Sequence, residues 1–432
     1  MKTKLLPGIL LAVTLLTPVV AQPGQGAAAA PTARKGAVPL IEKFQIFTAG
    51  KDGYANYRIP GIVLTTKGTV LAFCDARKDS KLGDWSTIEI FMRRSTTGGR
   101  TWEPQKKIIY LGLHEKHGYT FERSEVAVAQ GLGKDGQRPI TNQLPVVDRQ
   151  TGTIFLFHCV EQARCFLMNS TDDGVTWSPP VEVTNVFDGF KKTYPWKVLA
   201  TGPAHGIQLA NGRMIVPVWL SRGGGYNGHR PSVVSTIYSD DHGRTWHCGE
   251  IAADEKVPLI NPNETVAIQL ADGRVMLNMR NESPEHRRGI AISPDGATRW
   301  SKPIFDNALK EPICMAGFER LSTVATHGKN RILFSNPDND RDGDHTHETG
   351  GLYRKNLSLK LSYDEGKTWP VNKVLEPGPS GYSDLAILDD GTILCLYEDG
   401  LVRSGSRFPA KYITLARFNL EWLTDGNDTL SK

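Results

Sequence analysis

Short apolar runs, each preceded by a tight turn, recur along the whole chain. The copies are KGTVLAFC from residue 67, TGTIFLFH from 151, NGRMIVPV from 211, DGRVMLNM from 272, KNRILFSN from 329 and DGTILCLY from 390. Turn pairs such as Asn-Gly and Asp-Gly tolerate positive φ and close hairpins between twisted strands, and runs of Val, Ile, Leu and Phe suit strands buried on both faces. The pattern therefore predicts six β-hairpins.

A second phrase, eight residues long, recurs between these runs. STDDGVTW at 170–177 returns as SDDHGRTW at 239–246 and SYDEGKTW at 362–369, with worn copies at 95–102 (STTGGRTW) and 293–300 (SPDGATRW). The Asp can accept hydrogen bonds from the amides of its own turn, the Gly supplies a left-handed residue, and the Trp can pack between neighbouring sheets. We therefore interpret these Asp residues as structural and not catalytic.

The spacing of the repeats predicts the architecture. Turn glycines or their equivalents fall near 68, 152, 212, 273, 328 and 391, which is close to the spacing of a four-stranded sheet per repeat. We therefore expect an all-β fold, a six-bladed β-propeller that occupies residues 40–432. In a propeller the inner strands run alongside the central axis, so residues at equivalent distances from their turns should converge at one end of the channel.

Counting from the turns places a group of polar and charged residues at one level of that channel. The group consists of Arg58, Glu264 and Tyr382, nine or ten residues before their turn glycines, and Arg280, Glu398 and Arg77, seven to nine residues after theirs. For any single member, an ordinary ion pair at a strand end is the alternative interpretation. The shared register of all of them favours a functional site.

The first residues of the chain have the pattern of a signal peptide. Two lysines precede an apolar run that ends in small residues suited to signal peptidase. We expect a signal peptide over residues 1–21, because the apolar run is short and is broken by prolines; an uncleaved membrane anchor is the alternative. Residues 22–39 are rich in Ala, Gly and Pro without periodicity and predict a flexible N-terminal segment. The pattern predicts export to the periplasm or the medium.

Charge, hydropathy and cysteine content restrict the possible partners and predict the state of the cysteines. The formal net charge is +5 and the basic residues are scattered, which gives no case for nucleic acid binding. No stretch after the leader is apolar enough to span a bilayer, so we expect no stable membrane insertion after cleavage. Cys159 and Cys165 lie close enough in sequence to suggest a local disulfide, whereas Cys74 and Cys395 lie in apolar strands and are expected to be buried thiols.

Several motifs together carry a family resemblance. YRIPGIV at 57–63, the repeated S-x-D-x-G-x-T-W turns, GPAHGIQLANGR at 202–213 and GYSDLAILDDGTILCLYE at 381–398 resemble the exo-α-sialidases, over about residues 40–425. The Asp-containing turn alone is a weak signal, because many propellers without this activity carry it. Its conjunction with Arg-Ile-Pro near the start and Leu-Tyr-Glu near the end is much more specific. The resemblance implies an exported, bacterial-type sialidase that acts on sialylated glycans or glycoconjugates.

The resemblance assigns the binding of the sugar carboxylate to three arginines. The matching positions in this chain are Arg58, Arg280 and Arg354, with Arg341 as the nearby rival of Arg354. A planar guanidinium can bind a carboxylate bidentately and never loses its charge, which suits this task. Arg77 resembles a family arginine near the distal ring substituents of the substrate, and Glu398 resembles a residue that orients Arg58.

The resemblance assigns catalysis to a tyrosine and two carboxylates. Tyr382 matches the nucleophile and Glu264 the carboxylate that accepts its proton. Sialic acid bears a carboxylate on its anomeric carbon, so a neutral phenol avoids the repulsion that an Asp or Glu nucleophile would meet, but its pKa near 10 makes a base necessary. Asp84 matches the general acid, with Asp79 as the alternative. The implied reaction is hydrolysis with retention through a covalent tyrosyl intermediate, without a cofactor.

Other functions are open on the same residues. No motif marks the part of the site that would recognise the acyl group of the sugar, so the deaminated sugar KDN is an alternative substrate, and transfer or anhydro-sugar formation is an alternative outcome. From another class, a non-catalytic propeller could bind acidic sugars through the arginines alone. Such a protein would need none of Asp84, Glu264 and Tyr382, and their joint presence argues against it. The sequence does not decide the oligomeric state.

One acidic stretch suggests a metal site. DNDRDGDHTHE at 338–348 approximates the calcium loop D-x-D-x-D-G, with Asp338, Asp340 and Asp342 as ligands. Its Glu comes one place too early for the spacing of an EF-hand. The alternative interpretation is a solvated acidic loop, and no catalytic metal is expected.

Overall fold

The computed structural model describes most of the chain from residue 38 onwards. The described ranges are 38–79, 83–131, 138–225, 228–256, 258–339, 354–402 and 410–430. The expected signal peptide at 1–21 lies outside them, as does nearly all of the expected flexible segment at 22–39. All described residues belong to one compact unit, Ala37–Lys432. None of its described helices is long and apolar enough to cross a membrane.

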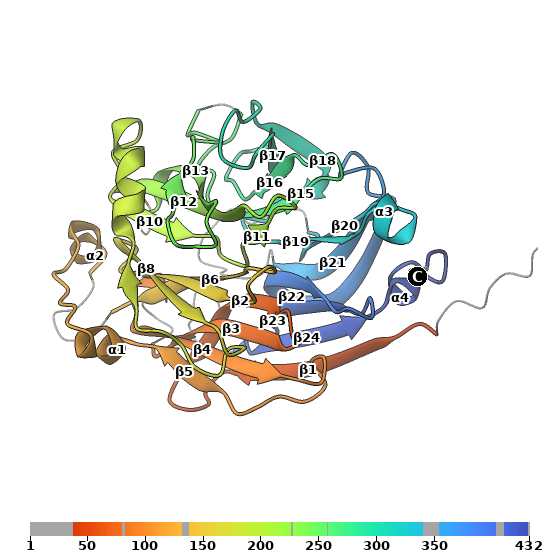
Figure 1. Ribbon diagram of the computed structural model, residues 1–432, viewed down its shortest axis with the longest axis horizontal. Helices are drawn as coiled ribbons and strands as arrows, with labels where there is room; N and C mark the ends of the chain where they lie inside the picture. The colour runs from red at the N-terminus through yellow and green to blue at the C-terminus, as the bar shows by residue number, and fades with distance from the viewer. Residues whose placement is uncertain are drawn as a thin grey trace, which may run out of the picture. The chain divides into compact units, whose positions relative to one another are not determined.

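Three of the sheets are four-stranded and antiparallel, with strands in chain order (Figure 1). The first consists of β2 (Asn56–Leu64), β3 (Val70–Arg77), β4 (Ile88–Ser95) and β5 (Lys106–Ile109). The second consists of β6 (Ile140–Val147), β7 (Ile154–Val160), β8 (Arg164–Ser170) and β9 (Val181–Glu182). The third consists of β15 (Thr265–Gln269), β16 (Val275–Met279), β17 (Arg287–Ser293) and β18 (Ile304–Lys310). Each predicted hairpin in these sheets is confirmed.

The two other sheets are larger. A five-stranded sheet consists of β10 (Val198–Thr201), β11 (Ile207–Gln208), β12 (Met214–Gly224), β13 (Arg230–Ser239) and β14 (His247–Cys248). A seven-stranded sheet consists of β1 (Ile41–Thr48), β19 (Gly317–Ser322), β20 (Arg331–Pro337), β21 (Lys355–Ser362), β22 (Val371–Ile387), β23 (Ile393–Asp399) and β24 (Tyr412–Phe418). In the latter, β1 pairs with β24, so the first and last strands of the described chain lie side by side (Figure 1).

The seven-stranded sheet departs from the prediction of six separate blades. β22 is 17 residues long; its first part pairs with β21 and its second part, from Ser380, pairs with β23. Because the hydrogen bonding continues through β22, the described residues form five sheets and not six. A count of apolar runs in the sequence cannot detect that two hairpin units share one continuous strand. The backbone hydrogen bonding of β22 passes from β21 to β23 without a break.

The innermost strands close a ring. β2 contacts β6, β6 contacts β10 and β11, β11 contacts β15, β15 contacts β19, β19 contacts β22, and β22 returns to β2. The arrangement of the sheets is therefore propeller-like and the fold is all-β, as the repeats predicted. Apolar side chains such as Leu144, Leu277 and Leu396 are fully buried between neighbouring sheets.

The recurring eight-residue phrase forms the turn that we predicted. In the three full copies the Asp accepts a hydrogen bond from the backbone amide four residues later, at 2.8–2.9 Å, and the Gly has a φ of +77° to +78°. The Trp246 ring packs edge-on against Phe157 of the preceding sheet, with centroids 4.8 Å apart. In a worn copy, the Thr97 hydroxyl replaces the Asp and accepts from the Thr101 amide at 2.9 Å. These Asp residues are structural.

Helices are few and short. The α-helices are α1 (Leu111–Lys116), α2 (Glu125–Ala129), α3 (Val324–His327) and α4 (Leu420–Leu423), and the 3-10 helices are η1 (Gly83–Trp85) and η2 (Thr184–Lys192). α1 and α2 lie on the left-hand side of Figure 1. The Ser124 side chain caps α2 by accepting from the Ala127 amide at 3.1 Å.

All six cysteines are free thiols. Cys159 on β7 lies directly opposite Cys165 on β8, so the sequence proximity of this pair was correctly noted, but the suggested disulfide is not formed. Cys74 and Cys395 are fully buried, as predicted. Burial raises the pKa of both thiols, which keeps them protonated.

Candidate active site

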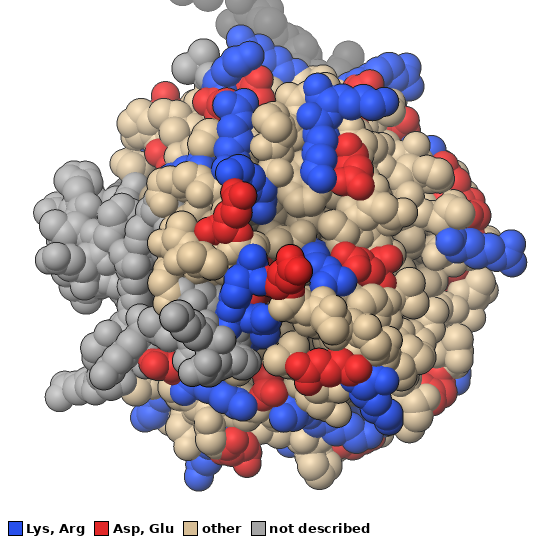
Figure 2. All heavy atoms as spheres, turned by 90° about the vertical axis from the view of Figure 1, so that its left-hand side faces the viewer, with Lys and Arg blue, Asp and Glu red and all other residues tan. Residues whose placement is uncertain are grey.

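A pocket lies at the end of the channel to which the register counting points. Its lining comes from the ends of many strands: Arg58, Ile59, Arg77, Asp84, Thr141, Asn142, Gln162, Trp219, His229, Arg230, Asn263, Glu264, Arg280, Glu282, Arg354 and Tyr382. Figure 2 shows the face that carries α1 and α2, on which Lys and Arg side chains alternate with Asp and Glu side chains instead of forming a field of one sign. Within the pocket, charged side chains are paired with one another, as in the ion pairs Arg77–Asp84 and Arg280–Glu264.

Glu264, Arg280 and Tyr382 form the centre of the pocket. The backbone amide of Arg280 donates to the Glu264 carbonyl at 3.0 Å, which sets the two side chains next to each other beyond the β15–β16 hairpin. Tyr382 Oη donates to Glu264 Oε1 at 2.6 Å and accepts from Arg280 Nη1 at 2.7 Å. Arg280 Nη1 also forms an ion pair with Glu264. The phenol is thus held between a proton acceptor and a cation.

The electrostatics of Tyr382 make a base necessary. Burial raises the pKa of Tyr382, Arg280 opposes that rise, and Glu264 adds to it; the net result is a pKa above the ordinary value. The phenol is therefore neutral in the free protein. A carboxylate already in hydrogen-bond contact can take its proton as the oxygen forms a new bond.

Two further arginines lie against the Tyr382 ring. The guanidinium carbon of Arg58 is 4.9 Å from the ring centroid and that of Arg354 is 5.1 Å away. Arg58 Nε lies 3.0 Å from Glu398 Oε1, and both side chains are buried. Arg354 donates to the carbonyl of Ile313. Three guanidinium groups therefore lie around one phenol, and each can turn towards an anionic ligand in the pocket.

A backbone irregularity directs Arg58 into the pocket. The pairing of β2 with β3 shifts between Arg58 and Gly61, and Ile59 has a φ of +58°. A β-branched residue in this region is strained, and such bulges re-aim neighbouring side chains. The Ile59 amide donates to Glu398 Oε1 at 3.0 Å, which holds the bulge in place.

Asp84 and Arg77 form a second pair in the pocket. Arg77 Nη1 lies 2.8 Å from Asp84 Oδ1. Burial opposes ionisation of Asp84, but Arg77, with weaker contributions from His229 and Arg58, lowers the pKa of Asp84 well below its usual range. Asp84 is therefore a carboxylate in this structure. Asp79, the alternative from sequence, is not among the described residues that line the pocket.

The structure brings together all of the predicted pocket residues and adds some that the sequence did not indicate. Arg58, Arg77, Asp84, Glu264, Arg280, Arg354 and Tyr382 all line the pocket, and Glu398 contacts Arg58 from behind it. The additions include Asn142, Gln162, Trp219 and His229. Asn142, 10 residues before Gly152, and Trp219, 7 residues after Gly212, stand at the register positions of Arg58 and Arg280, so the same counting could have found them. His229 lies 17 residues after Gly212, outside that register. Arg341, the rival of Arg354, lies outside the described residues.

Only the first two residues of the proposed calcium loop, Asp338 and Asn339, are among the described residues. Asp340 and Asp342 lie outside the described residues. Asp338 pairs with Lys360 at 2.9 Å and accepts from Asn372 at 2.8 Å, contacts that already occupy its carboxylate. Among the residues that the structure describes, no cluster of His, Cys, Asp and Glu could hold a metal ion.

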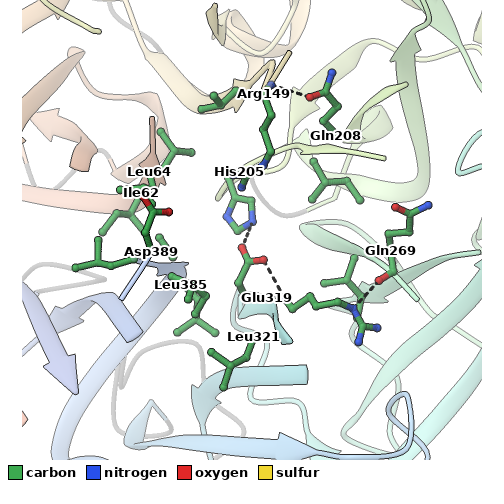
Figure 3. Close-up of a pocket in the computed structure, with 18 of the residues that line it drawn as sticks. Ile62, Leu64, Arg149, His205, Gln208, Gln269, Glu319, Leu321, Leu385 and Asp389 are labelled. Atoms are coloured by element: carbon green, nitrogen blue, oxygen red, sulfur yellow. Dashed lines mark hydrogen bonds and ion pairs between the residues drawn. The ribbon is translucent and has the colours of Figure 1, made fainter. Parts of the chain in front are cut away.

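A second pocket opens at the hairpin-turn end of the channel, and His205 lies in its wall (Figure 3). His205 Nδ1 lies 2.8 Å from Asp384 Oδ1 on β22, and its Nε2 lies 3.2 Å from Glu319 Oε2 on β19. Asp384 Oδ2 also accepts the Ile62 amide of β2 at 2.8 Å. These contacts connect strands from different sheets across the channel. Although burial opposes its charge, Asp384 and Glu319 raise the pKa of His205 to about 10.

The His205 contacts predict a pH dependence of stability. The folded-state pKa of about 10 lies above the unfolded value of about 6.5, so the stabilisation is complete below pH 6.5 and is lost as the pH rises towards 10. Between pH 7 and pH 9 we expect the free energy of unfolding of the wild type to fall by roughly 2.5 kcal/mol more than that of His205→Gln. Urea unfolding of both proteins at the two pH values measures this. Equal losses would contradict the role of His205.

Fold and pocket together define an all-β protein with a propeller-like arrangement of sheets and a pocket lined by arginines and a tyrosine–carboxylate pair. The BNR repeat-like domain model matches residues 108–395. The sialidase of Micromonospora viridifaciens is 31% identical over 428 residues, which cover 93% of this chain and 57% of that protein. Sialidase-3 of Bos taurus is 28% identical, covering 80% of this chain and 86% of that protein. The chain belongs to the sialidase family with BNR repeats.

Solved structures support the same fold. The Hadza microbial sialidase Hz136 superposes with a TM-score of 0.70 at 28% identity, over 88% of this chain and 69% of that one. An intramolecular trans-sialidase from Ruminococcus gnavus superposes with a TM-score of 0.65 at 19% identity, which shows the fold alone. The chain spans 57% and 62% of the lengths of the sialidases from Micromonospora viridifaciens and Bacteroides fragilis.

Proposed function

We propose that this protein is an exo-α-sialidase, which hydrolyses terminal α-ketosidically linked sialic acids of glycans or glycoconjugates with retention of configuration. The observation that carries the proposal is the position of Tyr382 Oη, 2.6 Å from Glu264 Oε1 and 2.7 Å from Arg280 Nη1. A phenol held in this way, inside a ring of arginines, fits a substrate that bears a carboxylate at its reacting carbon. The sialidases among its relatives support the same substrate class.

The arginines supply substrate binding in this proposal. Arg58, Arg280 and Arg354 take the sugar carboxylate, because their guanidinium groups lie around the Tyr382 side chain. Glu398 forms an ion pair with Arg58, and Glu264 forms one with Arg280. Preorganised charge of this kind costs little reorganisation when the substrate arrives.

The first chemical step uses Tyr382 and Glu264. As Tyr382 Oη attacks the anomeric carbon, its proton passes to Glu264 Oε1, with which it is already hydrogen-bonded. The bond to the leaving oxygen breaks, and a covalent glycosyl–tyrosine intermediate forms. Water then attacks the anomeric carbon from the opposite side, the bond to Tyr382 Oη breaks, and Glu264 returns the proton to that oxygen. The two displacements together retain the configuration.

Asp84 is the proposed proton donor to the leaving oxygen and the base for the attacking water. Its ion pair with Arg77 at 2.8 Å favours the carboxylate, which suits the second task better than the first. Proton donation therefore requires that the pair with Arg77 loosens when the leaving group enters the pocket. A leaving group that needs no proton would not depend on this change.

The substrate assay tests the proposal directly. We expect the wild type to release the aryl group from a fluorogenic α-glycoside of N-acetylneuraminic acid, and proton NMR to show the α-anomer as the first product. Turnover of the KDN glycoside alone would support the same mechanism, with KDN and not N-acetylneuraminic acid as the sugar of the substrate. An anhydro sugar or a transfer product would indicate transfer. Binding of the sugar without turnover of either glycoside would favour a non-catalytic propeller and contradict the proposal.

We also infer that the propeller has six blades. The inner ring contains six strands or strand groups, and the continuous strand β22 serves two of them, because it pairs with β21 over its first part and with β23 over its second. In this interpretation β19, β20, β21 and the first part of β22 form one blade. The second part of β22 forms another with β23, β24 and the N-terminal strand β1.

A further inference from the structure

A chain of side-chain hydrogen bonds along one wall of the pocket ends at His229. Asn142 Nδ2 donates to the backbone carbonyl of Thr201 at 3.3 Å, Gln162 Nε2 donates to Asn142 Oδ1 at 3.3 Å, and Gln162 Oε1 lies 2.6 Å from His229 Nε2. Because the Thr201 carbonyl can only accept, it fixes the orientation of the Asn142 amide. That amide fixes Gln162 in turn, and Gln162 presents its oxygen to the imidazole.

This chain determines which nitrogen of His229 carries the proton. An amide oxygen accepts, so Nε2 must donate, and in a neutral imidazole Nδ1 is then an unprotonated acceptor. Nδ1 has no hydrogen-bond partner among the residues that the structure describes, and His229 is only partly buried and lines the pocket. The pocket therefore contains an acceptor that the protein itself does not use.

His229 stays neutral in this environment. Burial lowers its pKa to about 4; Asp84 and Glu264 oppose that shift, and Arg230 and Arg280 add to it. At the pH values at which a hydrolase of this type would be assayed, His229 accepts at Nδ1 and carries no charge.

The ring is held rigidly. Its centroid lies 5.1 Å from that of Trp219 and 6.3 Å from that of Trp85. The preceding Gly228 has a φ of +71°, and a Cβ there would lie 2.3 Å from the Val126 side chain, so only glycine fits. On the other side, Arg230 Nε donates to Glu282 Oε2 at 2.8 Å. The acceptor nitrogen of His229 is therefore already in position before a ligand binds, so binding does not have to order the ring.

We propose that His229 is a specificity-determining residue whose Nδ1 accepts a hydrogen bond from a hydroxyl of the exocyclic chain of the sugar, and that the site discriminates against sugars in which this hydroxyl is acylated. The inference rests on the proposed function. Arg77 is the partner expected for the ring substituents, so the hydroxylated exocyclic chain supplies the remaining donors. An ester oxygen has no proton to donate and would place lone pairs against the lone pair of Nδ1.

The tautomer can be measured without any substrate. In histidine labelled with ¹⁵N, long-range proton–nitrogen spectra of the free protein at pH 6.5 should show His229 neutral and protonated at Nε2, with the signal assigned by its loss in His229→Asn. In Gln162→Ala the preference for this tautomer should weaken. A neutral His229 protonated at Nδ1, or an imidazolium at this pH, would overturn the inference.

Kinetics test the selectivity. For wild type, kcat/KM for an aryl glycoside with a free exocyclic chain should exceed that for its O-acetylated counterpart by about 10- to 100-fold. In His229→Phe, which keeps the ring but lacks the acceptor, the ratio should approach one. His229→Asn, which restores an acceptor near the position of Nδ1, should recover part of the wild-type preference for the glycoside with the free exocyclic chain. His247→Phe, outside the pocket, is the matched control and should keep the wild-type ratio.

The outcomes separate the two proposals. If the wild type cleaves both glycosides equally well, or if His229→Phe keeps the full ratio, His229 does not select the substrate, and the proposed function still stands. If the wild type cleaves neither, the proposed function fails. The dissociation constants of the two glycosides, measured by calorimetry for wild type and His229→Phe, then decide the role of His229 in binding.

Discussion

Tyr382→Phe is expected to lower the turnover of a sialoside by at least about a thousandfold while leaving the protein folded. The substitution removes one oxygen, which donates to Glu264 at 2.6 Å and accepts from Arg280 at 2.7 Å. The ring stays in contact with Arg58 and Arg354, so the arginines should keep their places. Steady-state release of the fluorogenic aryl group measures the loss, and thermal unfolding checks the fold.

Substrate binding distinguishes a lost nucleophile from a damaged pocket. The dissociation constant of a sialoside for Tyr382→Phe should stay within a fewfold of the wild-type value, because the carboxylate clamp is intact. Glu264→Gln keeps the shape of the side chain but cannot accept a proton from the phenol as readily, and we expect it to lose turnover as well. Turnover of Tyr382→Phe within tenfold of wild type would refute the role of Tyr382 as nucleophile.

Glu311→Ala is expected to destabilise the protein by about 3–5 kcal/mol. Arg288 and Glu311 are both buried, with exposed side-chain fractions of 0% and 1%. Glu311 Oε2 lies 2.5 Å from Arg288 Nη1, and Oε1 accepts the Cys314 amide at 2.8 Å. Removal of the carboxylate leaves a guanidinium that cannot lose its proton, buried among neutral acceptors only.

The reverse substitution should cost less. In Arg288→Met the remaining carboxyl group can take up a proton, and burial already raises the pKa of Glu311 despite the presence of Arg288. The double variant with Met at both positions should recover much of the loss, because an apolar pair of similar volume leaves no buried charge. Urea unfolding at pH 7 measures all three variants. A cost of Glu311→Ala below that of Arg288→Met would contradict this account.

Glu311 also links stability to the pocket. The turn that its carboxylate holds contains Ile313, whose carbonyl accepts from Arg354. A loss of this turn should therefore weaken the binding of an anionic sugar as well as the fold. The buried pair illustrates a feature that no pattern in the sequence indicated, since Arg288 and Glu311 belong to neither recurring phrase.

Sequence reasoning located most of the candidate site because repetition converts position along the chain into position in space. Glu264 and Arg280 flank the same hairpin at matching distances, and so do Tyr382 and Glu398. The resemblance assigned a role to Asp84, but nothing in the sequence paired it with Arg77, because a loop outside the repeating register carries Asp84. His229 was not indicated, since its role depends on Gln162 and Asn142 from another sheet.

The sequence by itself determined the all-β class, the hairpin repeats, the structural role of the Asp-containing turns and the level at which the charged residues meet. These features follow from local rules, because turn chemistry and apolar runs act within a few residues. Only the tertiary structure decided that β22 pairs with both β21 and β23, that His205 contacts Asp384 across the channel, and that Asp84 pairs with Arg77. Such contacts depend on how strands that are distant in the sequence meet in space. The spacing of residues along the chain does not determine how their side chains are oriented for hydrogen bonding.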